Sequence, residues 1–176
     1  MHNIEMASPA QVDDLIATVY ERVNSLLPEG PNWSSDTLNK LSDFPEAVKI
    51  IVLYNDFISE LAGGGIKQFL WSVCPNSEKY LSSLKPLYQT AGMETFNFYF
   101  EEFESKVRQM EDKCQSLKNL YASDNNNTDF YNAYMANLNT HEYWLDKLFI
   151  ETTLLQKWIS NHQNCLESFV NSYTKS

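Results

Sequence analysis

The chain has few glycines, cysteines and basic residues, and it has no long apolar run. Its 176 residues include 5 glycines, 3 cysteines and 3 histidines, and 13 Lys and Arg residues against 23 Asp and Glu residues. A membrane-spanning helix needs roughly 20 consecutive apolar residues, so we expect no membrane segment. The shortage of Lys and Arg argues against direct nucleic-acid binding, which requires phosphate neutralisation.

The cysteines and the N-terminal residues both indicate a cytoplasmic protein. Cys74, Cys114 and Cys165 are far apart in the sequence and odd in number. That arrangement favours reduced thiols over a disulfide framework. Residues 1–5 have neither a basic region nor an apolar run, so we expect no signal peptide.

The acidic residues are unevenly distributed. The formal net charge is −10, and residues 1–59 carry nine Asp and Glu against three Lys and Arg. A net negative surface favours basic partners or solubility. We therefore expect the N-terminal helices to contribute any acidic partner-binding face, with these candidate residues: Asp13, Asp14, Glu21, Asp36, Asp43 and Glu46.

Apolar residues recur at helical spacing in the first half of the chain. Ser8, Pro9 and Gln11 resemble a capping box that opens a first helix. The segment 27–31 ends that helix, and a short helical turn is expected at 37–41. A central helix opens at Pro45, with this buried side: Val48, Ile51, Val52, Ile58 and Leu61.

Further helices are expected in the second half. One begins at Ser77 and kinks or ends near Pro86, and Gly92 precedes a long helix over residues 96–121. Its acids Glu101, Glu102 and Glu104 are expected on a solvated face.

No alternating strand pattern is present, so we predict an all-α fold. It comprises one domain (1–176) of about six to eight helices. Within it, 8–123 holds the N-terminal and central helices, 124–128 is a loop, and 129–172 is helical.

The most distinctive stretch is a glycine triplet, Gly63, Gly64 and Gly65, between Glu60 and Gln68-Phe69. Each glycine costs roughly 1 kcal/mol relative to alanine inside a helix, so the triplet predicts a joint between two helical segments. Gln68 is expected to act first as a structural clamp beside this joint. The stretch lacks the Lys-Ser/Thr ending of a phosphate-binding P-loop.

This stretch resembles the signature of a bacterial helical domain family: an acidic residue, Asn-Gly-Gly, an apolar residue, a spacer, and Gln before an aromatic residue. Glu60, Gly64, Gly65, Gln68 and Phe69 match, Gly63 replaces the usual Asn, and Ile66 stands where an aromatic residue or leucine is usual. The family includes an acidic, dimeric DNA-mimic protein that occupies the DNA-binding face of a transcription factor. The resemblance implies a helical homodimer with a protein partner.

Little in the sequence points to catalysis. His162 and Cys165 are three residues apart and share a helical face, and His141 is a further candidate base. A closed zinc site needs four ligands, and a Cys–His pair needs a geometry that spacing alone does not establish. There is no G-x-S-x-G element and no dinucleotide fingerprint. We expect no metal, no cofactor and no enzymatic activity.

Three functions follow as hypotheses. The first is an acidic interaction protein whose carboxylates imitate DNA phosphates and bind a basic regulator. The second is an immunity-like or antitoxin-like module that blocks a toxin, for which Trp33 or Trp71 would supply an exposed aromatic patch. The third is an enzyme acting in a cleft beside Glu60 and Gln68.

Overall fold

The all-α prediction is confirmed. The structure is a computed structural model that describes residues 8–27, 35–123 and 145–172. These ranges contain no strand, and they form six α-helices and one 3-10 turn: α1 (Pro9–Leu26), α2 (Ser35–Leu41), α3 (Glu46–Val73), α4 (Ser77–Tyr88), α5 (Glu94–Ser123), η1 (Leu145–Leu148) and α7 (Thr152–Ser172). The predicted loop at 124–128 and the segment 129–144 lie outside the described residues.

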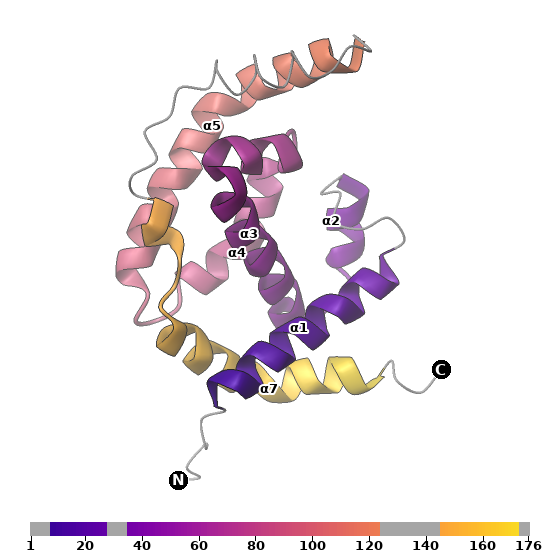
Figure 1. Cartoon of the computed structure of the whole chain (residues 1–176), viewed down its shortest axis with the longest axis vertical. Coiled ribbons are helices and arrows are strands. Elements are labelled where there is room, and N and C mark those ends of the chain that lie inside the picture. Colours follow the sequence, from indigo (N-terminus) through magenta and orange to yellow (C-terminus); the bar gives the residue numbers. More distant parts are fainter. Residues whose placement is uncertain (1–7, 28–34, 124–144, 173–176) are drawn as a thin grey trace.

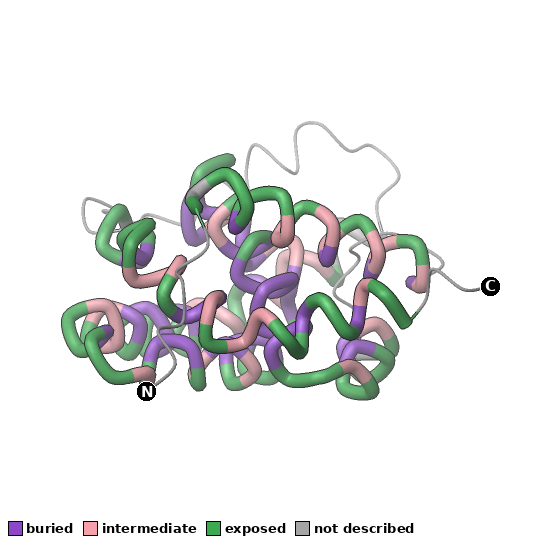
Figure 2. Tube along the Cα trace, turned by 90° about the horizontal axis from the view of Figure 1, so that it is seen from below, coloured by how far each residue is buried: buried purple, intermediate pink, exposed green. Residues whose placement is uncertain are grey.

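Helix α3 forms the centre of the molecule, because one side of it is almost continuously apolar. Its N-terminal end lies at the crossing of α1 and α7, and α5 lies on another side of it (Figure 1). It packs against α1, α4, α5, α7 and η1. Val48, Ile51, Val52 and Leu61 are buried as predicted, and Ile58 is half-buried. Figure 2 shows buried and exposed positions alternating along the helices.

The start of α1 is fixed by the predicted capping box. The Ser8 backbone N–H donates to Gln11 Oε1 at 2.8 Å, and the Gln11 N–H donates to Ser8 Oγ at 3.4 Å. The two bonds satisfy N–H groups that lack intrahelical partners in the first turn. Val12, Val19 and Val23 then bury one face of α1 in the core.

The glycine triplet interrupts α3 as predicted. Gly64 and Gly65 leave the helical conformation, with φ/ψ of −171°/20° and 67°/−154°, and the helix resumes beyond them to Val73. Only Gly65 has a positive φ at this joint. The break turns the second segment of α3 so that Phe69 enters the core, where it is fully buried.

An aromatic cluster joins α3, α4 and α5. Phe57 meets Phe69, Phe100 and Phe103 edge-on, with ring centroids 5.2–6.2 Å apart. Tyr88 stacks on Phe100 with centroids 4.2 Å apart. Edge-on and stacked aromatic pairs stabilise a core beyond simple area burial, so this cluster holds the three helices together.

The C-terminal end of α4 lies near Pro86, as predicted from the sequence. Pro86 lies in its last turn and the helix ends at Tyr88. Gly92, with φ of 93°, then reverses the chain before α5 begins at Glu94.

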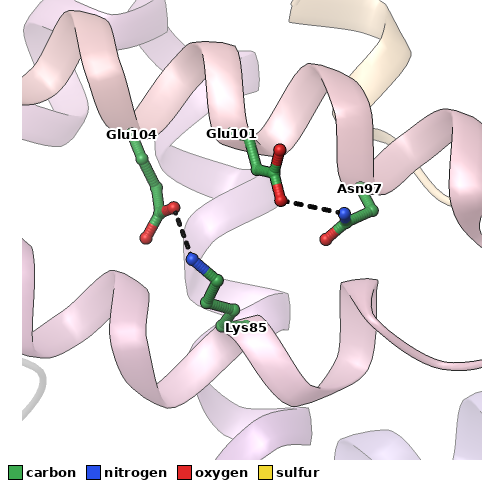
Figure 3. A network of polar contacts seen from close by, with 4 residues as sticks. All are labelled: Lys85, Asn97, Glu101 and Glu104. Carbon is green, nitrogen blue, oxygen red and sulfur yellow. Dashed lines mark hydrogen bonds and ion pairs between the residues drawn. The ribbon is translucent and has the colours of Figure 1, made fainter.

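The prediction that Glu104 lies on a solvated face is wrong. Glu104 is only 8% exposed, whereas Glu101 and Glu102 are exposed as predicted. Glu104 is turned towards α4, where Lys85 Nζ donates to its Oε2 at 3.1 Å (Figure 3). Burial of the charge is tolerated because the ion pair offsets its desolvation.

This ion pair gives a first prediction. Replacing Lys85 with Met leaves the buried Glu104 carboxylate without its cation, and we expect a loss of about 1–3 kcal/mol in the free energy of unfolding. Lys147→Met is the matched control. Lys147 pairs with Asp146 at the surface, where the two side chains are 53% and 65% exposed, and exposed pairs contribute about 0–1 kcal/mol. Urea unfolding of both variants tests this, and equal losses would contradict it.

Candidate functional site

The six candidate acidic residues are all exposed. Asp13, Asp14 and Glu21 lie on α1, and the others lie on α2, on the following turn and in the first turn of α3: Asp36, Asp43 and Glu46. Among the described residues, none of the six side chains has a hydrogen bond or an ion pair. Asp36 and Glu46 also interact favourably with the N-terminal end of their own helix dipoles. The three acids of α1 have no such structural explanation.

Two hollows follow one another along the junction of α1 and α7. The first, of about 240 Å³, is lined by Asp14 and Thr18 of α1 and by Gln163 and Glu167 of α7. The second, of about 270 Å³, shares Thr18 and extends along α1 to Glu21. We call the two together the acidic groove, defined by Asp14, Thr18, Glu21, Gln163 and Glu167.

The acidic groove contains carboxylates from both helices, two from α1 and one from α7. Asp14 and Glu21 are seven residues apart, which places them on one face of α1 and about 10 Å apart along its axis. Gln163 Nε2 donates to Glu167 Oε1 at 2.7 Å, which orients the third carboxylate. Arg22 and Ser25 also line the second hollow. The arrangement can accept charge-assisted hydrogen bonds from Lys and Arg side chains of a partner.

Glu167 was not among the residues proposed from the sequence. Its position on α7 gives no signal by itself, because the groove exists only where α7 packs against α1. Periodicity predicts which side of each helix is exposed, but it does not tell which two helices adjoin.

The glycine-motif residues lie in and beside the core. Phe69 contacts Phe57, Tyr80 and Phe103, and Gly65 is buried at the joint. Gln68 is half-buried beside Gly64, where an added Cβ would lie 2.9 Å from Gln68 Cβ. Gly63 is exposed with open space beside it. These positions favour a structural role for the motif.

A buried polar cluster adjoins the motif between α1, α3 and α4. Asp56 is 6% exposed, and its Oδ2 accepts a hydrogen bond at 3.0 Å from the Tyr80 hydroxyl, which also donates to the Leu53 carbonyl at 2.7 Å. Burial raises the pKa of Tyr80 well above its ordinary value, and the charge of Asp56 raises this pKa further. The hydroxyl therefore stays protonated and ties α4 to α3.

Glu60 lies at the edge of this cluster. Its charge raises the pKa values of Tyr20 and Tyr80, less than burial and Asp56 do, and its Oε2 atom is buried without a hydrogen-bond partner among the described residues. Asp56 was not predicted as a site residue, because it is a single acid within an apolar helix face.

In the described ranges no group of three or more His, Cys, Asp and Glu side chains is arranged to hold a metal ion.

His162 and Cys165 line a third hollow, of about 340 Å³, with Glu46 and Asn161. His162 Nδ1 lies 2.7 Å from the Trp158 carbonyl oxygen, and the two rings stack with centroids 4.1 Å apart. These contacts give His162 a packing role, while Cys165 is exposed. The other candidate base, His141, lies outside the described residues.

Only one of the two tryptophans proposed for a toxin-blocking surface lies within the described residues. Trp33 lies outside the described residues, and Trp71 is half-buried, with Lys118 Nζ 5.7 Å from its ring centroid. Among the described residues, the large apolar side chains that are exposed are instead Phe98, at 57%, and Phe149, at 37%. None of the three hollows described above is lined by Glu60 or Gln68.

Comparison of the chain with known protein families, with curated proteins and with solved structures gives no match. No helix in the described ranges combines the length and the apolar character needed to cross a membrane.

Proposed function

We propose that this protein is a non-enzymatic, acidic interaction protein that binds a basic surface of another protein. The observation that carries the proposal is the set of exposed carboxylates on α1, which have no cationic partner among the described residues although the chain has 13 Lys and Arg residues. Glu104, by contrast, forms an ion pair with Lys85. Carboxylates that are exposed and unpaired remain available to a partner's cations.

The preferred partner is a DNA-binding regulator, whose DNA-binding face is basic. One strand of duplex DNA carries a phosphate about every 3.4 Å of helix rise, so the ~10 Å between Asp14 and Glu21 along α1 matches the rise of about three base-pair steps. The resemblance of the glycine stretch to a family with a DNA-mimic member supports the same proposal. The proposal also includes a cytoplasmic location, a homodimeric state and no direct binding of nucleic acid.

The alternative is a toxin-blocking module of the immunity or antitoxin kind. Phe98, which meets Tyr99 edge-on with centroids 5.4 Å apart, favours this alternative because an exposed aromatic side chain can anchor a protein interface. Such a complex would depend on apolar burial and would therefore resist salt.

The test is an affinity pull-down from host lysate, with the recovered proteins identified and their affinities measured. The variant Asp13→Asn/Asp14→Asn/Glu21→Gln removes the three acids of α1. The control Glu78→Gln/Glu102→Gln/Asp112→Asn removes three exposed acids of α4 and α5 whose side chains have no hydrogen bond or ion pair among the described residues. Both variants change the net charge equally.

We expect to recover a DNA-binding protein that is displaced by duplex DNA or by about 0.5 M salt. At that salt concentration the Debye length falls to a few ångströms, which screens the charges of the complex. The α1 variant should weaken this complex at least about tenfold, and the control should leave it within about twofold. Equal weakening by both variants would mean that only net charge matters. A salt-resistant complex that Phe98→Ala abolishes would favour the toxin-blocking alternative.

A further inference from the structure

Two cysteines that are far apart in the sequence meet where α5 crosses the end of α3. The Cys114 thiol donates to the Leu70 carbonyl at 3.6 Å, one turn before Cys74 on α3. The Cys74 thiol in turn donates to the Glu111 carbonyl at 3.8 Å, one turn before Cys114 on α5. Each thiol therefore lies against the backbone of the other cysteine's helix, one turn before that cysteine, and both residues are buried.

The same face of α5 fixes the turn between α3 and α4. Lys118 Nζ donates to the Trp71 and Cys74 carbonyls at 2.9 and 2.7 Å, at the C-terminal end of α3. The Glu111 carboxylate accepts hydrogen bonds from the backbone N–H and the hydroxyl of Ser77, at the N-terminal end of α4. A cation at a helix C-terminus and an anion at a helix N-terminus both interact favourably with the helix dipoles. Cys114 lies between Glu111 and Lys118, so the thiol pair is held on both sides.

We propose that Cys74 and Cys114 form a reversible disulfide that fastens α5 to the turn between α3 and α4. The oxidant is a peroxide. One thiol loses its proton and attacks a peroxide oxygen, which gives a sulfenic acid and water. The second thiol then attacks the sulfenic sulfur and displaces a second water, so the two thiols lose two electrons in total and form one S–S bond. A dithiol reductant reverses the step by thiol–disulfide exchange.

The surroundings of Cys74 favour its protonated thiol over the thiolate. The hydrogen bond to Cys114 and burial raise the pKa of the Cys74 thiol, and Lys118 opposes this shift only in part. Because the thiolate is the reactive form, oxidation of the pair should be slow at neutral pH and faster as the pH rises. The exposed Cys165 has no comparable shielding and reacts separately.

The experiment uses the full chain with Cys165→Ser, so that only the buried thiols remain. The folded protein is treated with hydrogen peroxide, its free thiols are alkylated, and a proteolytic digest is analysed by mass spectrometry without reduction. Thermal unfolding is followed before and after treatment with dithiothreitol. The controls are Cys74→Ser/Cys165→Ser and Cys114→Ser/Cys165→Ser.

We expect a linked peptide pair containing Cys74 and Cys114 at a yield that does not depend on protein concentration. We also expect the unfolding midpoint to rise by about 5–15 °C, because the bond closes a long loop, and dithiothreitol to reverse the rise. Neither control should show a rise. Thiols that stay alkylatable after prolonged treatment, separate sulfinic acids without a link, or a link that forms only in denaturant would overturn the proposal.

Discussion

Replacing Gly65 with alanine should destabilise the protein by about 2–4 kcal/mol. Its φ of 67° and ψ of −154° fall in a region that is essentially restricted to glycine, where another residue costs about 1–3 kcal/mol. The residue is also buried, and adding volume at a well-packed buried site typically costs about 1–3 kcal/mol more. The change therefore acts on both the backbone and the packing of the joint.

Gly63 provides a matched control two residues earlier. It lies in the helical part of α3 before the break and is exposed, and a Cβ added to it would meet nothing within 4 Å. Gly63→Ala should therefore stabilise the protein by up to about 1 kcal/mol. Urea unfolding of both variants measures the contrast. A Gly65→Ala variant as stable as Gly63→Ala would show that the joint does not need a positive φ.

The difference between these glycines marks a limit of prediction from sequence. Three consecutive glycines predict a break in the helix, and α3 has one. They do not say which residue takes the positive φ, because that depends on the angle at which the second segment must leave to bring Phe69 into the core. Packing of the whole aromatic cluster decides this angle.

The same distinction applies to the charged residues. The exposure of Asp13, Asp14 and Glu21 agrees with helical spacing, because these residues lie away from the buried apolar face of α1. Helical spacing failed for Glu104, because the neighbouring Lys85 belongs to α4, and the register of α4 against α5 is a tertiary property. The acidic groove and the Cys74–Cys114 pair also join helices that are distant in the sequence. The pattern of a single helix predicts which of its residues are exposed. A site made by two helices can be predicted only when the packing of the two helices is known.

Phe69→Ala should have the largest effect on stability, a loss of about 3–5 kcal/mol. The side chain is fully buried, and its ring contacts Phe57, Tyr80 and Phe103 with centroids 5.3–5.4 Å apart. Truncation removes the transfer free energy of the ring and leaves a cavity that the surrounding rings fill only in part. Phe69→Leu, which keeps more of the volume, should cost less. Phe98→Ala is the matched control, because Phe98 is 57% exposed and surface changes are usually within about 0.5 kcal/mol.

Phe69 also separates a structural role of the glycine motif from a binding role. The residue lies in the core and lines neither hollow of the acidic groove. If the motif acts only through the fold, partner binding by Phe69→Ala should fall in proportion to the fraction unfolded, and conditions that restore folding should restore binding. Asp13→Asn/Asp14→Asn/Glu21→Gln should show the reverse pattern, with binding lost and unfolding little changed. Binding that stays lost in fully folded Phe69→Ala would instead place the motif at the partner interface.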